Sequence, residues 1–453
     1  MRRAIALLLL ATSASAAPSR FSRFEREADA LRRELRIPGM SAVILENQKI
    51  VWMKGFGFAD LEKHVPATPD TLFHIASLTK TFAATLVLRL VEEGKLDLDE
   101  PVARYSKDIT DERVKIKHLI SHTSEGTPGD AYAYSGNRFD ALTAVIEAKY
   151  GKPFRQVMID TFLVPLQMTE SVPGHDVEKD PVLGPRYAKQ LTQFAKPYTL
   201  YGTDEIVPSG YPPRDMGAAA GLLSTVRDMA KFDVAIDRHV FLKPETQARA
   251  WTPFLSNAGQ PLRHGLGWFV ENYRGVKLIW HFGNWGTGFS ATYLKVPEKQ
   301  LSMILLANSE GLSENLYGTD GIETNAIACA FLRDLVFHGG DACTAVAAEA
   351  MKSRLAAHAA RVRKAVTVDA KLLQEYVGSY LRDDQPWTYV VTREGNRLFI
   401  DIGGGSEMFA ESDSQFFFKN RPYTARFVRD STGAVVALEF EDGGQTLRAK
   451  RVK

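Results

Sequence analysis

The order of strand-like and helix-like segments constrains the fold of this 453-residue chain more than any other feature. Two apolar runs, 41–45 and 50–54, flank the polar stretch 46–49 and are typical of a β-hairpin. A mainly helical region extends to residue 232, and strand-like segments return between residues 265 and 307. Strands at both ends of one region predict an α+β fold, in which N-terminal and C-terminal strands share an antiparallel sheet flanked by helices.

The last part of the chain has a different pattern. An alanine-rich, basic segment at 344–365 predicts a connecting helix, and six segments between 389 and 452 then alternate apolar and polar residues. Turn signals such as Asp442-Gly443-Gly444 separate these segments. Short strands at this spacing predict a small antiparallel β-barrel, lipocalin-like in outline, or a sandwich. We therefore expect a larger domain at 17–364 and a barrel domain at 365–453.

The first residues have the pattern of an export signal. Arg2 and Arg3 precede an apolar run at 4–11, and Ala14-Ser15-Ala16 supplies the small residues that a signal peptidase reads. Eight apolar residues are far fewer than the roughly 20 that a membrane-spanning helix needs. The sequence therefore predicts a signal peptide at 1–16, cleaved near Ala16, and a periplasmic or secreted protein.

Charge and cysteine content limit the partners and the chemistry. The chain has 56 basic and 54 acidic residues, and removal of 1–16 takes away two arginines, which leaves 54 of each. A net charge of zero argues against nucleic acid and anionic membranes as partners. Cys329 and Cys343 can form a disulfide in an oxidising compartment, or they can be two buried thiols that never meet.

One short motif carries candidate chemistry. Ser77-Leu78-Thr79-Lys80 lies in a stretch, 72–91, that predicts a helix, and residues three apart lie on the same helical face. A serine hydroxyl becomes a good nucleophile when a nearby base takes its proton, and lysine is such a base when burial lowers its pKa. Ser-x-x-Lys alone also fits a helix-capping serine followed by an exposed lysine, so its surroundings decide between the two interpretations.

Those surroundings resemble a known group of enzymes. The chain contains Phe73–Thr81 (FHIASLTKT), Lys115–Ser124 (KIKHLISHTS), Pro165–Thr169, Ala220–Thr225 and His264–Trp268 (HGLGW), in that order. This set resembles the serine β-lactamase and penicillin-binding-protein-like superfamily, in particular its branch of class C β-lactamases, D-aminopeptidases and family VIII carboxylesterases. The resemblance implies a two-lobed core, with an antiparallel sheet flanked by helices and an all-helical lobe.

The resemblance also implies roles for individual residues. Ser77 is the expected nucleophile, and Lys80 and Tyr134 are expected to handle its protons. Tyr134 begins the Tyr-x-Asn element, but here the asparagine position is Gly136 and Asn137 follows one residue later. We expect Asn137 to contact substrate in its place.

The Lys-Thr-Gly element of the family, often His-x-Gly in this branch, matches His281-Phe282-Gly283. By resemblance, His281, Phe282 and Gly283 are expected to line the substrate-binding site. The backbone N–H groups of Ser77 and Asn284 are expected to form the oxyanion hole, and each such donor is worth about 10²–10³ in rate.

These observations predict an exported serine hydrolase that cleaves esters or amides through an acyl-enzyme on Ser77. Gly136 and Phe282 lack the groups that bind a lactam's amide and carboxylate, so we rank an esterase or a D-amino-acid-directed peptidase above a true β-lactamase. A non-catalytic binder or sensor of cell-wall peptides is the alternative of another class. The expected partner is a small ester, peptide or cell-wall-derived substrate, and the oligomeric state is open.

No cofactor or metal is implied by the sequence. His118 and His122 are four residues apart, as in some metal pairs, but no glutamate lies between them and no third ligand is nearby. We therefore interpret both histidines as structural.

Overall fold

The computed structural model describes residues 20–212, 216–316, 321–340, 343–383, 387–401, 405–442 and 445–452. The predicted signal peptide at 1–16 lies outside the described residues. Within the described ranges, no helix has both the length and the apolar character needed to cross a membrane.

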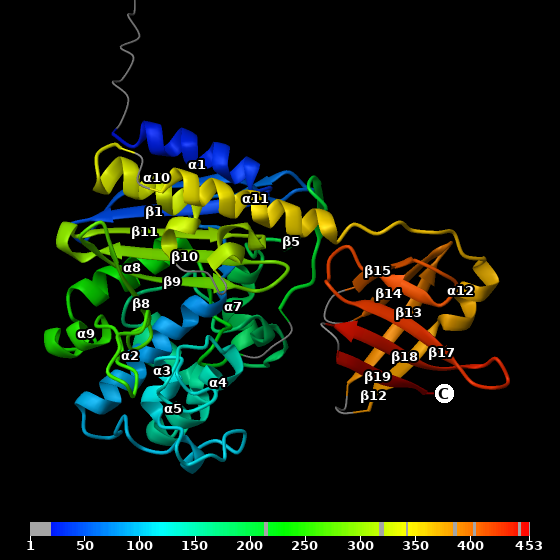
Figure 1. The fold of residues 1–453 in the computed structure, drawn as a ribbon, viewed down its shortest axis with the longest axis horizontal. Helices are drawn as coiled ribbons and strands as arrows, with labels where there is room; N and C mark the ends of the chain where they lie inside the picture. The colour runs from blue at the N-terminus through cyan, green and yellow to red at the C-terminus, as the bar shows by residue number, and fades with distance from the viewer. Residues whose placement is uncertain are drawn as a thin grey trace, which may run out of the picture.

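A seven-stranded antiparallel sheet forms the centre of the larger part of the molecule (Figure 1). Its spatial order is β3-β2-β1-β11-β10-β9-β8. The strands are β1 Gly39–Glu46, β2 Lys49–Asp60, β3 Val65–Pro66, β8 Phe269–Tyr273, β9 Val276–Asn284, β10 Ser290–Val296 and β11 Leu301–Ala307. Because β1 pairs with β2 on one side and with β11 on the other, the sheet is assembled from both ends of the domain, as the sequence predicts.

Both faces of this sheet are covered by helices. On one face lie α1 (Ser22–Glu34), α10 (Ala326–Phe331) and α11 (Thr344–Ala360), and on the other lie α2 (Thr79–Glu92) and α8 (Val226–Asp237) (Figure 1). Successive residues of β1 enter opposite cores, because side chains alternate along a strand. Val43 packs in the core that contains α2, whereas Ala42 and Ile44 pack in the core that contains α1. This two-sided burial explains why β1 is almost continuously apolar.

Short helices build a lobe around the buried helix α2. They are α3 Ile116–Ile120, α4 Gly136–Asp140, α5 Leu142–Tyr150, α6 Phe154–Met158, α7 Leu183–Leu191 and α9 Pro244–Ala250. Almost every side chain of α2 as far as Leu88 is buried. A helix that is apolar on all sides is stable only in the interior, so α2 is a rigid support for whatever lies at its N-terminus.

A two-stranded ribbon leads into α2. Strand β4 (Phe73–His74) pairs with β7 (Leu223–Ser224), and a 3₁₀ turn at Ala76–Leu78 joins β4 to α2. The helix that the sequence predicts over 72–91 therefore begins only at Thr79. Pairing with β7 holds residues 73–74 extended, and this tertiary contact overrides the local helical preference.

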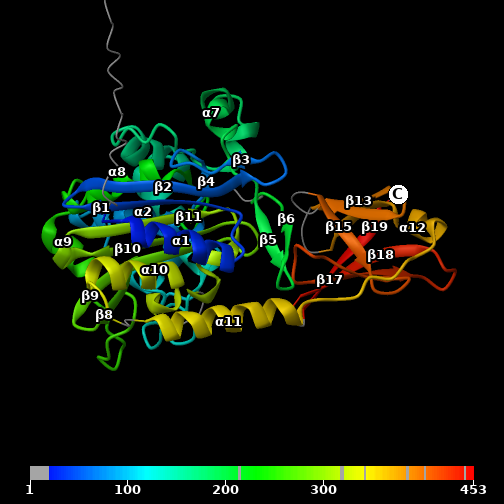
Figure 2. The ribbon, with the colours of Figure 1, turned by 90° about the horizontal axis from the view of Figure 1, so that it is seen from above.

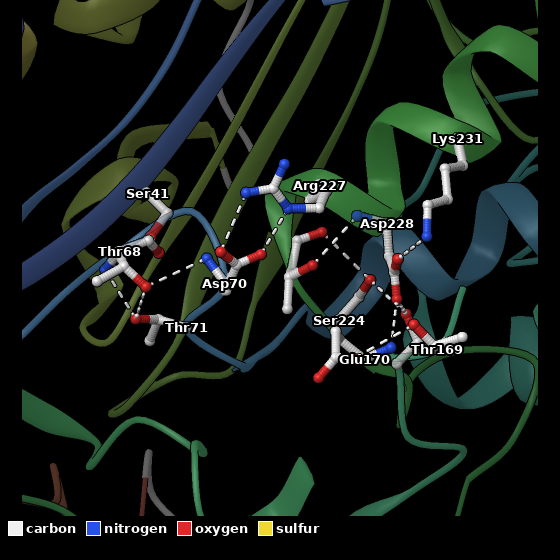
Figure 3. A network of polar contacts seen from close by, with 12 residues as sticks. Ser41, Thr68, Asp70, Thr71, Thr169, Glu170, Ser224, Arg227, Asp228 and Lys231 are labelled. Atoms are coloured by element: carbon white, nitrogen blue, oxygen red, sulfur yellow. Dashed lines mark hydrogen bonds and ion pairs between the residues drawn. The ribbon is translucent and has the colours of Figure 1, made fainter. Parts of the chain in front are cut away.

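A polar network fixes the position of β7 (Figure 3). Ser224 Oγ lies 2.8 Å from Ser171 Oγ, which also donates to Asp228 in the first turn of α8. The guanidinium of Arg227 forms two hydrogen bonds, of 2.6 and 3.0 Å, to the carboxylate of Asp70. The network joins three segments that are far apart in sequence, and it holds the ribbon from which the turn at Ala76–Leu78 emerges.

The C-terminal strands form a closed eight-stranded antiparallel barrel. They are β12 Gly378–Arg382, β13 Thr388–Glu394, β14 Arg397–Asp401, β15 Gly405–Ala410, β16 Gln415–Phe417, β17 Thr424–Arg429, β18 Val435–Asp442 and β19 Gln445–Val452, and helix α12 (Ala370–Tyr376) precedes them. Aromatic rings fill the interior, and those of Tyr376 and Phe427 stack at 4.0 Å. The predicted barrel is confirmed, although β12 and β15 are not among the segments recognised in the sequence.

Among the described residues, the barrel contacts the hairpin of the larger domain that is formed by β5 (Tyr198–Tyr201) and β6 (Glu205–Pro208) (Figure 2). Lys419 Nζ lies 2.7 Å from a carboxylate oxygen of Glu205, and the rings of Phe417 and Tyr201 stack at 6.3 Å.

The two cysteines are bonded to each other. Cys329 lies in α10 and Cys343 directly precedes α11, with 5.7 Å between their Cα atoms. The sequence allows either a disulfide or two buried thiols that never meet, and the structure has the disulfide.

Candidate active site

Ser77 lies in the 3₁₀ turn between β4 and α2, and 8% of its surface is exposed. The preceding residue, Ala76, has a φ of +48°, a left-handed conformation that is unfavourable for a residue with a Cβ. The turn is held by hydrogen bonds, because Ile75 N–H donates to Leu222 O and Leu78 N–H donates to Ile75 O. The serine is therefore fixed in a strained turn at the start of a rigid helix.

Lys80 lies one helical turn further on, with Nζ 2.9 Å from Ser77 Oγ and 2.8 Å from Ala219 O. Only 1% of its surface is exposed. Burial lowers the pKa of Lys80 from 10.5 to about 7, because the ammonium loses its hydration, and the carboxylate of Asp140 partly opposes this shift. The aromatic ring of Phe139 lies 5.4 Å from Nζ. Near neutral pH a large fraction of Lys80 is thus a free amine beside the serine hydroxyl.

Tyr134 lies on the other side of Lys80. Its ring centroid is 5.2 Å from Lys80 Nζ, and the ring stacks on His122 at 4.4 Å. The ring of Phe282 packs 5.2 Å away. A hydrogen bond from Ala133 N–H to His122 O anchors the chain directly before Tyr134. These contacts hold the phenol beside the serine–lysine pair.

Ser77, Lys80 and Tyr134 line one cleft of about 150 Å³, which we call the active-site cleft. Its other lining residues are His74, Gly136, Asn137, Asp140, Gly217, Ala219, Ala220, Gly221, Asn284 and Trp285. Five of the expected site residues are therefore brought together here: Ser77, Lys80, Tyr134, Asn137 and Asn284. Lys80 and Asp140 are the charged residues among the described residues that line the cleft.

The end of β9 reaches the nucleophile because of Gly283. A Cβ added at Gly283 would lie 2.2 Å from Ile75 O, so a larger residue would push the strand away from the turn that carries Ser77. The close approach places Asn284, the next residue, in the lining of the cleft. Gly283 thus acts by letting the strand approach, whereas we expected it to line the substrate site.

The structure does not place the side chains of His281 and Phe282 where we expected them. Both are buried, with 0% and 1% of their surfaces exposed, and neither lines the active-site cleft. Phe282 belongs to the hydrophobic core that contains α1, and His281 Nδ1 lies 2.7 Å from Phe282 O. The side chains of these two residues are therefore buried in the protein interior and are not part of the described lining of the cleft.

Sequence reasoning missed three side chains that line the cleft: His74, Asp140 and Trp285. His74 lies within the Phe73–Thr81 motif, and Trp285 follows Asn284, so proximity to known motifs could have indicated both. Burial lowers the pKa of His74 to about 3, and its ring lies 5.1 Å from that of Trp285. Asp140 Oδ1 accepts a hydrogen bond of 3.0 Å from Ala219 N–H.

An aromatic cluster supports this end of the cleft. The ring of Phe289 lies 6.0 Å from His74 and stacks on Phe194 at 5.2 Å, and Phe194 contacts Tyr211 at 4.9 Å. Phe194 and Tyr211 belong to the segment 170–216, which matches no motif in the sequence. Phe194 and Tyr211 of this segment therefore support the wall made by His74 and Trp285 from behind.

The chain is similar to known proteins over almost its whole length. The Beta-lactamase family model matches residues 22–322, and a domain of unknown function, DUF3471, matches residues 362–451. Penicillin-binding protein 4* of Bacillus subtilis (strain 168) is 23% identical over 441 residues, which cover 88% of this chain and 92% of that protein.

Two solved structures have the same fold. The octameric penicillin-binding protein homologue from Pyrococcus abyssi has a TM-score of 0.60 at 21% identity, and the match covers 95% of this chain and 99% of the other. The crystal structure of SurE with D-Leu has a TM-score of 0.53 at 20% identity and covers 96% and 100%.

Proposed function

The chain belongs to the Beta-lactamase family, and on that basis we propose that it is a serine hydrolase that cleaves ester or amide bonds through an acyl-enzyme on Ser77. One observation carries the proposal: a buried lysine, its pKa lowered to about 7, lies 2.9 Å from the hydroxyl of Ser77. A lysine of this kind is a base at neutral pH, and a serine so placed is a nucleophile.

The geometry supports a two-step reaction. The neutral amine of Lys80 accepts the proton of Ser77 Oγ while one of its N–H groups donates to Ala219 O, and Oγ attacks the carbonyl carbon. The resulting oxyanion is stabilised by the backbone N–H groups of Ser77 and Asn284. Lys80 and Tyr134 pass the proton to the leaving group, and water then releases the acid by the same steps in reverse order.

The composition of the cleft favours some substrates over others. Lys80 is the one positively charged residue among the described residues that line the cleft, and it is engaged with Ser77, so within this described lining no arginine is available to bind a substrate carboxylate. Asp140 instead suits a cationic group such as a free α-ammonium. Gly136 offers no side-chain amide to a lactam. We therefore favour esters and peptides with an N-terminal D-amino acid over β-lactams, in keeping with a structural neighbour crystallised with D-Leu.

We also propose that the protein is exported to the periplasm or secreted, with cleavage near Ala16. The bond between Cys329 and Cys343 supports this proposal, because structural disulfides persist in oxidising compartments.

The test compares three substrates and two variants. We expect hydrolysis of p-nitrophenyl butyrate and of D-alanine p-nitroanilide to be much faster than that of nitrocefin, and all activity to be lost in Ser77→Ala. Ser353→Ala is the matched control, since that serine is exposed on α11 and does not line the cleft. Efficient nitrocefin turnover would establish a β-lactamase instead.

A covalent probe separates an enzyme from a binding protein. A fluorophosphonate should transfer its phosphonyl group to Ser77 Oγ with loss of HF, so the peptide that contains Ser77 should gain the mass of the probe less that of HF, and Ser77→Ala should stay unlabelled. A folded protein that forms no adduct and hydrolyses none of the three substrates would support the alternative, a non-catalytic binder of cell-wall peptides.

A further inference from the structure

We propose that His122, His264 and His281 form a binding site for a single transition-metal cation such as Zn²⁺, directly behind the active-site cleft. One ring nitrogen of each lies within 4.8 Å of those of the other two. The three residues are 2%, 0% and 0% exposed. The site is additional to the proposed hydrolase activity and does not depend on it.

The hydrogen bonds of two of the rings leave their inner nitrogens free to bind a cation. His264 Nδ1 lies 3.0 Å from Gly265 O, and His281 Nδ1 lies 2.7 Å from Phe282 O. A carbonyl oxygen only accepts hydrogen bonds, so Nδ1 carries the proton in both rings and each Nε2 has an exposed lone pair. Both Nε2 atoms are buried and have no hydrogen-bond partner. A backbone carbonyl on the far nitrogen is the usual support of a metal-binding histidine.

The third ring needs a change of tautomer. His122 Nδ1 accepts a hydrogen bond from Ser135 N–H that is long, at 3.3 Å, and its buried Nε2 has no partner. To bind a cation, this ring must move its proton from Nε2 to Nδ1 and give up that bond. His122 also has a left-handed backbone, with a φ of +55°, and the centroid of its ring lies 5.0 Å from that of His264.

The size of the triangle fits a cation after a small contraction. The three nitrogens are at most 4.8 Å apart, and an equilateral triangle with sides of 4.8 Å has its centre about 2.8 Å from each corner. Zinc–nitrogen bonds are about 2.0–2.1 Å, so each ring must shift inward by at most about 0.8 Å. Three imidazoles leave a fourth position of a tetrahedral zinc for water or another small ligand.

The position of the cluster provides a route to the cleft. The ring of Tyr134 stacks on His122 at 4.4 Å and also lines the active-site cleft. A cation can therefore reach the three histidines from the cleft when the phenol ring turns aside.

A second group of candidate metal ligands in the described chain is already paired with a positively charged side chain. Glu310, Glu314 and His358 also bring their ligand atoms together. However, the guanidinium of Arg354 lies between them, 2.6 Å from Glu314 and 3.7 Å from Glu310. A resident cation already satisfies these carboxylates, so we do not propose a metal there.

The experiment uses the full chain stripped of metal with a chelator and titrated with Co²⁺, a spectroscopic substitute for Zn²⁺. We expect one equivalent to bind and to give the intense visible absorption of tetrahedral cobalt. His264→Phe keeps the shape of the ring but removes one ligand, and it should weaken binding by more than the about 10–100-fold typical of losing an outer-shell partner. His358→Gln is the control for the other cluster and should bind Co²⁺ like the unmodified protein.

X-ray absorption of the Zn²⁺-loaded protein gives a result even if His264→Phe fails to fold. Scattering from three imidazole rings at about 2.0 Å is the expected outcome. The proposal is wrong if the unmodified protein takes up no Co²⁺ at about 1 mM, if the bound metal shows only oxygen ligands, or if folded His264→Phe binds as tightly. Ser77→Ala should bind the metal normally, so the test of the metal site does not depend on whether the protein is a serine hydrolase.

Discussion

The charge of Asp140 should set the pH at which the enzyme becomes active. An ordinary lysine, with a pKa of 10.5, is neutral in about 0.03% of molecules at pH 7, whereas a lysine with a pKa of about 7 is neutral in about half. The difference corresponds to about 5 kcal/mol at 1.36 kcal/mol per pKa unit. Burial produces this shift and Asp140 opposes it, because a carboxylate stabilises the nearby ammonium.

Asp140→Asn removes the charge but keeps an oxygen that can accept the hydrogen bond from Ala219 N–H. The pKa of Lys80 should then fall further. The rising limb of kcat/KM against pH, which reports the free enzyme, should be centred near 7 in the unmodified protein and should move to lower pH in the variant. Activity at pH 6 relative to pH 8 should therefore increase.

The assay is the hydrolysis of p-nitrophenyl butyrate, corrected for spontaneous hydrolysis, between pH 5 and pH 9. This substrate is uncharged, so loss of Asp140 does not change its electrostatic attraction to the cleft. Asp204→Asn, on an exposed residue paired with Arg36, is the control and should leave the limb in place. The assignment of Lys80 as the desolvated base would be refuted if the rising limb of kcat/KM against pH did not move in Asp140→Asn. It would also be refuted if that limb were centred near pH 10 in the unmodified protein.

Four further changes have defined expected results. Lys80 has a folded-state pKa below its unfolded value, so its protonation destabilises the fold as pH falls below about 10, and this effect is complete below about 7. Lys80→Met should abolish turnover and yet add about 2 kcal/mol to the free energy of unfolding in urea at pH 7. This value is about 4 kcal/mol of relieved desolvation less about 1 kcal/mol for each of the two lost hydrogen bonds. Gly136→Asn, where an added Cβ meets no atom within 4 Å, should fold normally and raise the ratio of nitrocefin to ester turnover. Phe282→Thr should cost about 3 kcal/mol in urea unfolding without improving the KM for nitrocefin, because the side chain is buried. Replacement of both Cys329 and Cys343 by alanine should lower stability by about 3 kcal/mol, and a reducing agent should then have no further effect on the melting temperature.

The sequence predicts the fold well where a local pattern and the tertiary structure agree. The two-ended sheet follows from alternating and apolar runs, and the barrel follows from short strands with turn signals. The start of α2 is different, because Phe73–His74 is extended only through its pairing with Leu223–Ser224, about 150 residues away. Ala76 beside Ser77 has a left-handed conformation, and no property of alanine indicates it.

In the candidate site, too, some positions follow from local sequence patterns and others are determined only by the tertiary structure. Ser77 and Lys80 are three residues apart on one helix, so their proximity is readable from spacing. His281 and Phe282 are near the site in sequence, but the side chains of both are buried in the protein interior. The grouping of His122 with His264 and His281 joins residues about 140 positions apart, and no periodic signal in a single sequence reports such a contact.

The position of the barrel suggests how a domain outside the cleft can affect catalysis. None of the described residues that line the active-site cleft belongs to the barrel. The barrel does, however, bind the β5–β6 hairpin through Lys419 and Phe417. The chain continues from that hairpin to Ser209, which bonds Thr287, and to Tyr211 in the aromatic cluster behind His74. Loss of the barrel would release one end of this connection. Removal of the barrel should therefore weaken substrate binding at the wall of His74 and Trp285. The serine–lysine pair should be unaffected, because its supports lie in α2 and β7.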